Sequence, residues 1–201
     1  MRPGLAALEL AEDPDAWAAL GFVVDGGRCR VGATQLRLRG GDGGIRSWTL
    51  AGAASAEVDG LPTTLGEPPG GAAAAHPNGV TGVDHVVVAT PDARRTFAAL
   101  GAAGIEVRGA QETATARRGF GLLRDALVEV VGPLRPDGDH PAAFWGLTLV
   151  AADLDAAAAL LGDRLGPVKD AVQPGRRIAT VRAQAAGIHT PLALITPRAA
   201  T

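Results

Sequence analysis

The chain of 201 residues contains one cysteine, Cys29, and one lysine, Lys169. A single cysteine excludes an internal disulfide and a metal cluster built on cysteine ligands. The first residues do not resemble a signal peptide, and no run of about 18 apolar residues occurs that would span a membrane. The formal net charge of −2 gives no electrostatic basis for binding nucleic acid or an anionic membrane surface. We therefore expect a cytoplasmic protein with neither partner.

What the chain does contain is an apolar fraction of 47%, enough for a packed core, and an internal repeat. The segment 83–133 predicts a strand, a helix with Asp92 as its N-cap, and three more strands. The segment 144–197 predicts the same order with Asp153 as the N-cap. The spacing from each aspartate to the Leu-Gly pair that ends its helix is identical. Two β-α-β-β-β modules in one chain indicate an α+β fold.

The region before the repeat predicts a weaker copy of the same module. Residues 1–52 contain short strand candidates and a helix that begins at Asp13-Pro14. Residues 53–79 are rich in Gly, Pro and Ala and are interpreted as a linker. The main domain is then 80–201. Because a third module leaves one sheet face or edge without a partner, we expect the N-terminal module to cover part of the main domain or to pair in a homodimer.

Three sequence segments carry a resemblance to a known family. They are DHVVV at 84–88, VEVVGP at 128–133 and WGLTLVAADLDAA at 145–157. Together with the repeat order they resemble the vicinal oxygen chelate superfamily, which includes glyoxalase I, extradiol dioxygenases and bleomycin-resistance proteins. The resemblance covers about 80–197 well and the N-terminal part loosely. It implies that paired βαβββ modules form an incomplete barrel around a cavity, with the helices outside.

The resemblance also implies metal ligands on the first and last strands of each module. His85 stands at the first-strand position and Glu129 at the last-strand position, so a divalent metal and a catalytic role for Glu129 are expected. The second module has no counterparts. Alignment places Gly146, or after a shift of two residues Thr148, opposite His85, and Ala193 opposite Glu129. A site with four protein ligands is therefore incomplete.

The residues themselves leave alternatives open. A lone His and a lone Glu on apolar strands fit a weak metal site, and they also fit a plain hydrogen-bonded pair. Arginine pairs at 117–118 and 176–177 occupy equivalent places, and one member of each pair can face inward toward an anionic group. The alternative is that these arginines pair with surface acids. The expected substrate contacts are Arg118, Arg177, Thr148 and Trp145, and core packing is the alternative for Trp145.

The other histidines, His76, His140 and His189, lie beside Pro or Gly and are interpreted as solvated loop residues. Two main functions remain. One is a glyoxalase- or dioxygenase-like enzyme, a lyase or isomerase included, in which a metal polarises an oxygen atom of a small oxygenated metabolite. The other is a non-catalytic protein that sequesters a small molecule, as the resistance proteins of that superfamily do. A relic without a ligand is a third reading.

Overall fold

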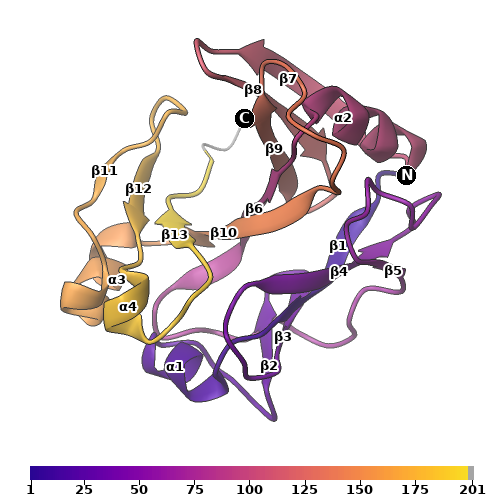
Figure 1. Ribbon diagram of the computed structural model, residues 1–201. Helices are drawn as coiled ribbons and strands as arrows, with labels where there is room; N and C mark the ends of the chain where they lie inside the picture. Colours follow the sequence, from indigo (N-terminus) through magenta and orange to yellow (C-terminus); the bar gives the residue numbers. More distant parts are fainter. Residues whose placement is uncertain (199–201) are drawn as a thin grey trace.

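The computed structural model describes residues 1–198, which form two sheets with short helices around them (Figure 1). The larger sheet has eight strands in the order β11-β12-β13-β10-β6-β9-β8-β7. Its first module consists of β6 (Val80–Ala89), α2 (Ala93–Ala102), β7 (Glu106–Glu112), β8 (Ala116–Leu122) and β9 (Leu127–Pro133). Its second consists of β10 (Ala143–Ala151), α3 (Leu154–Leu161), the 3-10 turn η1 (Gly162–Arg164), β11 (Lys169–Asp170), β12 (Arg177–Thr180), α4 (Ala183–Ala186) and β13 (Leu192–Ile195).

The two modules share one strand topology. In each, the first strand pairs in parallel with the last, β6 with β9 and β10 with β13. The first strands then pair with each other in antiparallel fashion and join the modules into one sheet. The predicted N-caps are confirmed: Asp92 accepts hydrogen bonds from two N–H groups at the start of α2, and Asp153 does the same for α3. The predicted α+β class with paired βαβββ modules is therefore confirmed, with the short helix α4 as an addition.

The N-terminal sheet repeats the same plan in reduced form. Its order is β2-β3-β1-β4-β5, with β1 parallel to β3, β4 parallel to β5, and β1 antiparallel to β4. The strands β1 and β4 thus pair with each other as the first strands β6 and β10 of the larger sheet do, and each has a parallel partner on its other side. The strand β5 lies inside the stretch 53–79 that the sequence predicts to be a linker. The elements are β1 (Gly4–Leu10), α1 (Pro14–Ala19), β2 (Arg28–Val31), β3 (Thr34–Leu38), β4 (Ile45–Ala51) and β5 (Thr63–Leu65).

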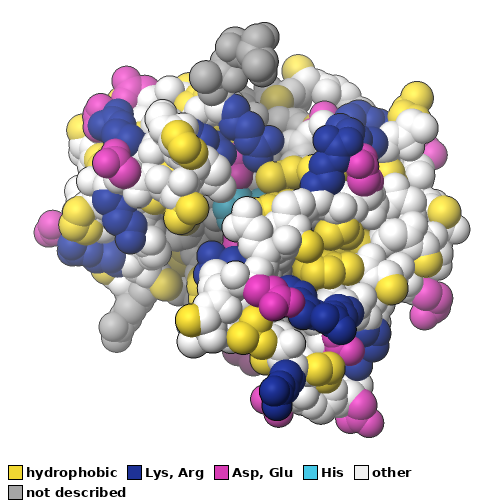
Figure 2. Space-filling view, turned by 90° about the horizontal axis from the view of Figure 1, so that it is seen from above, with side chains coloured by type: hydrophobic (Ala, Val, Ile, Leu, Met, Phe, Trp, Pro, Cys, Tyr) yellow, Lys and Arg dark blue, Asp and Glu magenta, His cyan; other side chains and the backbone are white. Residues whose placement is uncertain are grey.

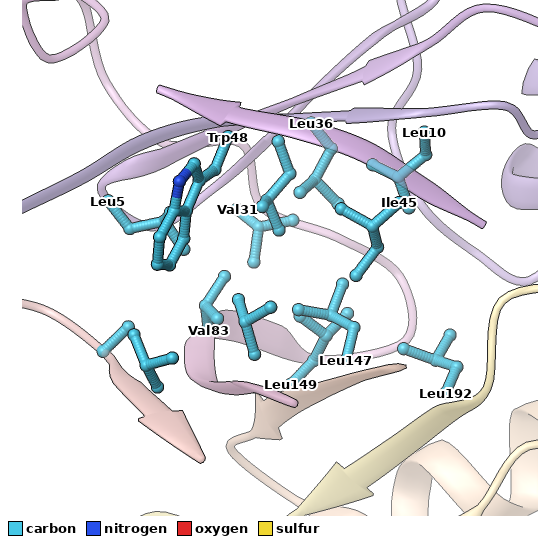
Figure 3. Close-up of a cluster of buried hydrophobic side chains, with 14 of the residues drawn as sticks. Leu5, Leu10, Val31, Leu36, Ile45, Trp48, Val83, Leu147, Leu149 and Leu192 are labelled. Carbon is cyan, nitrogen blue, oxygen red and sulfur yellow. The ribbon is translucent and has the colours of Figure 1, made fainter. Parts of the chain in front are cut away.

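An apolar layer joins the N-terminal sheet to the larger sheet (Figure 3). Side chains of the N-terminal sheet, such as Leu36 and Trp48, face Val83 and Leu149 on the central strands β6 and β10. The rings of Trp48 and Phe144 meet edge to face with centroids 5.3 Å apart. The N-terminal part therefore covers the back of the main sheet, one of the two arrangements expected from the sequence.

A buried carboxylate ties the two sheets together at a second point. Glu12 has no exposed surface, and its oxygens accept hydrogen bonds from the backbone N–H groups of His189 and Thr190 and from the Thr190 hydroxyl. These residues immediately precede Pro191 and strand β13. Because a buried charge is costly unless it is hydrogen-bonded, this contact fixes the approach to β13 from the N-terminal side.

Three register shifts interrupt the pairing of β6 with β10, and two of them are bulges that affect side chains at the cavity. His85 pairs with Thr148 and Val83 pairs with Leu149, so Asp84 is the extra residue of the first bulge. As a result Val83 points toward the N-terminal sheet (Figure 3) while His85 points to the opposite face. Simple strand alternation predicts that these two side chains share a face, and that prediction is wrong because of the bulge. Trp145 is the extra residue of the second bulge.

Candidate functional site

The larger sheet curves around a cavity of about 440 Å³. Its wall includes residues of β8 and β12, each the second strand from an edge of the sheet, which shows that the sheet forms the incomplete barrel expected. Figure 2 shows this face of the molecule hollowed, with a histidine and hydrophobic side chains in the depression and basic side chains around it. The volume lies within the range of about 300–1,000 Å³ typical of small-molecule sites. The lining residues are His85, Val87, Ala89, Arg118, Glu129, Val131, Trp145, Leu147, Thr148, Ile178, Thr180, Pro191, Leu192 and Ala193.

The lining is divided into a polar wall and an apolar wall. The polar wall comes from the first module, where Glu129 of β9 lies between His85 of β6 and Arg118 of β8. The Nε2 atom of His85 is 3.4 Å from one carboxylate oxygen, and a guanidinium nitrogen of Arg118 is 3.8 Å from the other. Neither contact meets the geometry of a hydrogen bond, and within residues 1–198 the Glu129 side chain has no hydrogen-bond partner. Its oxygens are therefore available to a bound molecule.

Behind the polar wall, His85 is held by a buried carboxylate. Its Nδ1 atom is 2.8 Å from an oxygen of Asp84, and the other oxygen of Asp84 accepts a hydrogen bond of 2.7 Å from Arg176. Burial alone would raise the pKa of Asp84. The hydrogen bonds from His85 and Arg176 and the charges of Arg176 and Arg198 outweigh it, and they lower the pKa to about 2. Asp84 is therefore a carboxylate near neutral pH, and His85 Nδ1 is the donor to it.

The structure places three of the four expected substrate contacts in the cavity. Arg118 and Thr148 line it, and Thr148 is buried beside His85 as its partner across the strand pair. Trp145 lies at the cavity with 60% of its surface exposed, so the core-packing alternative is wrong for this residue. The adjacent Phe144 instead packs against Trp48 in the core.

The expectation for Arg177 needs correction. Its guanidinium makes a two-pronged ion pair with Asp155 of α3, 3.0 and 2.8 Å between paired atoms, and it does not line the cavity. The inward member of this arginine pair is Arg176, which is 4% exposed. Adjacent residues face opposite ways, as predicted, but the sequence does not reveal which one faces inward.

A second correction concerns the histidines. His76 is buried, not solvated: its Nδ1 accepts a hydrogen bond from the Val23 N–H, and its Nε2 donates to the Arg30 carbonyl. Desolvation by burial lowers its pKa, against a smaller opposing effect of the bond to Arg30. His140 and His189 are exposed, as predicted.

The metal site expected from the resemblance does not fit the donor set. His85 and Glu129 are together, but their neighbours from the second module are Thr148 and Ala193, which offer no carboxylate or imidazole. In the part of the chain that the structure describes, no three His, Cys, Asp or Glu side chains lie close enough to hold a metal ion. Asp84 is engaged by Arg176 instead. Two donors fall short of the three protein ligands that catalytic zinc sites use.

Three solved structures are similar to this one over most or all of the chain. They are a mutant 4-hydroxymandelate synthase from Streptomyces coelicolor, catechol 2,3-dioxygenase, and a xylose isomerase-like TIM barrel/4-hydroxyphenylpyruvate dioxygenase fusion protein. The first has a TM-score of 0.61 and 14% sequence identity, and the match covers 100% of this chain and 94% of that one. The second has a TM-score of 0.60 and 14% sequence identity, and the match covers 96% of this chain and 88% of that one. The third has a TM-score of 0.65 and 11% sequence identity, and the match covers 100% of this chain and 50% of that one.

The chain therefore has the vicinal oxygen chelate fold, as the sequence resemblance predicted. The match with 4-hydroxymandelate synthase spans the N-terminal sheet as well, consistent with its plan of two joined first strands. No protein-family model and no curated protein matches the sequence. Since one fold supports many activities, the function has to be argued from the cavity itself.

Proposed function

We propose that this protein binds a small organic molecule in the cavity of the larger sheet. The observation that carries the proposal is the Glu129 carboxylate, which faces a mainly apolar cavity without a hydrogen bond from the described residues. A carboxylate in such surroundings is costly unless another group satisfies it. A bound molecule with a hydroxyl or N–H group would donate to Glu129 and so offset this cost.

The two walls of the cavity define the chemistry of that molecule. Arg118 offers guanidinium N–H donors next to the Glu129 acceptor, so one polar group of the ligand can donate to Glu129 and accept from Arg118. The opposite wall, with Ile178 and Ala193 among its side chains, suits an apolar body. Trp145 provides an exposed aromatic face at the cavity. A hydroxylated or carboxylated molecule with an aromatic or aliphatic body fits this arrangement.

A second candidate function, catalysis of proton transfer, is supported by the contact between His85 and Glu129. Asp84 orients His85, and the Nε2 atom lies 3.4 Å from the Glu129 carboxylate. A carboxylate beside an oriented imidazole can take a proton from a bound molecule and pass it on. This role makes the protein an isomerase- or lyase-like enzyme with Glu129 as the catalytic residue. Conversion of a bound compound, followed by NMR, separates catalysis from sequestration.

The binding proposal is tested by screening hydroxylated and carboxylated aromatic compounds for a rise in melting temperature, followed by calorimetry. A ligand that binds only the folded state must raise its stability. Ala193→Phe fills the cavity from β13, and Ala110→Phe places the same ring on the exposed strand β7 as a control. We expect Ala193→Phe to abolish binding and Ala110→Phe to retain it. Binding that survives Ala193→Phe unchanged would place the ligand elsewhere and refute the proposal.

Two further predictions from the sequence, a homodimer and a cytoplasmic location, are kept as proposals. No helix among residues 1–198 is long and apolar enough to cross a membrane. Light scattering after size-exclusion chromatography tests the dimer, and a monomeric mass at micromolar concentration would contradict it. Fractionation of cells that express the tagged protein tests the location.

A further inference from the structure

A chain of buried polar contacts crosses from the second module to His85 in the first. Arg176, just before β12, donates to Asp84 over 2.7 Å, and Asp84 accepts from His85 Nδ1 over 2.8 Å. The side chains of Arg176, Asp84 and His85 are 4%, 3% and 10% exposed. The imidazole then presents Nε2 to Glu129 at the polar wall. The second module thus reaches the polar wall through one guanidinium group.

The guanidinium of Arg176 is itself anchored to the backbone. Its Nε and one terminal nitrogen donate to the Thr196 carbonyl over 2.8 and 2.6 Å, directly after β13. That carbonyl fixes the plane of the group, and the same terminal nitrogen reaches Asp84. A lysine at this position would keep the charge but not the forked geometry. Asp84 is therefore held by an arginine that is itself fixed between the start of β12 and the end of β13 in the other module.

Stability alone gives little reason for such a pair. Two charges removed from water lose hydration that their attraction often fails to repay, and apolar replacements of buried ion pairs are often neutral or stabilising. The bulge at Asp84 is a further departure from regular pairing, and bulges commonly redirect a side chain near functional sites. Both features bear on one visible outcome, the orientation of the His85 ring.

We propose that Arg176 and Asp84 are positioning residues of the cavity, which hold the His85 ring with Nδ1 as the proton-bearing atom and Nε2 turned to Glu129. This inference rests on the proposed function of the cavity. The proposal means that the second module, through Arg176, orients a residue of the polar wall, although this module supplies no acidic or imidazole side chain to that wall. Arg198, which lies 3.3 Å from the same Asp84 oxygen, is half-exposed and adds a second, weaker contact.

The protein contains an internal reference for this assignment. His76 has the opposite arrangement, since its Nδ1 accepts from the Val23 N–H and its Nε2 donates to a carbonyl. Long-range ¹H–¹⁵N spectra report which ring nitrogen carries the proton. In the ligand-free protein near neutral pH we expect a protonated Nδ1 for His85 and an unprotonated Nδ1 for His76. Signals are assigned with His85→Gln and His76→Gln.

Three variants then test the positioning role, with Arg177→Met as the matched control one residue away. Asp84→Asn keeps one acceptor oxygen, which Arg176 requires, and its NH2 group then faces His85 as a donor, so we expect the His85 Nδ1 signal to lose its protonated character. Arg176→Met should broaden or shift the His85 signals, and Arg176→Lys should restore them only in part. Arg177→Met should leave them unchanged, because Arg177 pairs with Asp155 on α3.

Two results would overturn the inference. One is an unprotonated Nδ1 of His85 in the wild-type protein, a measurement that does not depend on the folding of any variant. The other is an unchanged His85 spectrum in folded Asp84→Asn and Arg176→Met. All spectra are recorded without a ligand. If no screened compound binds to the cavity, that result contradicts the proposed function. It does not change the outcome of the test of the positioning residues.

Discussion

The two modules of the larger sheet have one topology and different chemistry. Each has its last strand parallel to its first and a helix capped by an aspartate, Asp92 in one and Asp153 in the other. The first module supplies His85, Glu129 and Arg118 to the cavity, whereas the second supplies mainly apolar side chains. The difference teaches that the repeat preserves the backbone that encloses a cavity, while each copy carries its own side chains toward it.

The contrast is sharpest at the strand pair that joins the modules. His85 and Thr148 are direct partners across it, and Thr148 in turn pairs with Ala193 of β13. An imidazole thus meets a hydroxyl and then a methyl group at adjacent inward positions. This change from polar to apolar side chains across the strands explains why one cavity has a polar wall and an apolar wall. It also explains why the described residues of the two modules do not form a shared metal site.

The largest effect is expected from breaking the contact that crosses between modules. Asp84→Ala leaves Arg176 buried without its countercharge, so we expect the free energy of unfolding to fall by about 3–5 kcal/mol. Arg177→Ala breaks an exposed pair within the second module and should cost far less. Urea denaturation of both variants measures the difference. Equal losses in the free energy of unfolding would show that the buried pair stabilises the protein no more than the exposed pair does.

One substitution can give the second module a metal-binding side chain at the cavity. Thr148→His places a second imidazole beside His85 and Glu129 and completes three donors. We expect zinc to bind at least roughly tenfold more tightly than to the wild type, a gain of about 1.4 kcal/mol. Thr180→His lines the same cavity from β12, two strands away from Thr148, and serves as the control. Calorimetry with zinc measures both, and equal affinities would contradict the placement of the donors.

His76, outside the two modules, provides a buried histidine held by backbone groups for comparison with His85. Burial lowers its pKa from 6.5 in the folded protein, so the unfolded chain binds more protons once the pH falls below about 6.5. Stability is then full above this pH and decreases below it, by no more than about 1.4 kcal/mol per pH unit for one proton. Urea denaturation from pH 8 to 5 should show a weaker decrease in His76→Gln. Exposed His140→Gln should follow the wild type.

The smallest effect tests what the two modules share. Asp92→Ala and Asp153→Ala each remove a side chain that accepts hydrogen bonds from two N–H groups at a helix start. Each should lower the free energy of unfolding by about 1 kcal/mol. Thermal unfolding of the two variants checks whether the losses are similar. A loss of stability in only one of the two variants would show that the aspartate cap stabilises the helix of that module alone.

Much of the fold was predictable because it depends on local patterns. Apolar strands, capping aspartates and their equal spacing are written in consecutive residues, and they predict two modules of one topology. The short strand β5 was not predictable, since Thr63–Leu65 lies in a stretch rich in Gly and Pro and exists through its pairing with β4. The buried state of His76 was missed for a similar reason, because its hydrogen-bond partners lie more than 40 residues away.

The candidate site was predictable where one residue type stands out on its strand. His85 and Glu129 interrupt apolar runs, and the structure brings them together at the cavity. Arg177 was expected to face inward, but Arg176 is the inward member of the pair and contacts Asp84 behind the polar wall. Alternation gives opposite faces without saying which face is inner. Asp84 was missed because a bulge turns it, and nothing in the sequence DHVVV marks a bulge.

The sequence by itself determined the repeat, the class of fold and the first module as the carrier of the polar residues. Only the tertiary structure decided that Arg176 reaches across to Asp84, that Thr148 lies beside His85, and that the N-terminal sheet covers the back of the larger one. The physical reason is range. Strand and helix patterns arise from neighbouring residues, whereas strand register, bulges and buried ion pairs depend on groups brought together from distant parts of the chain.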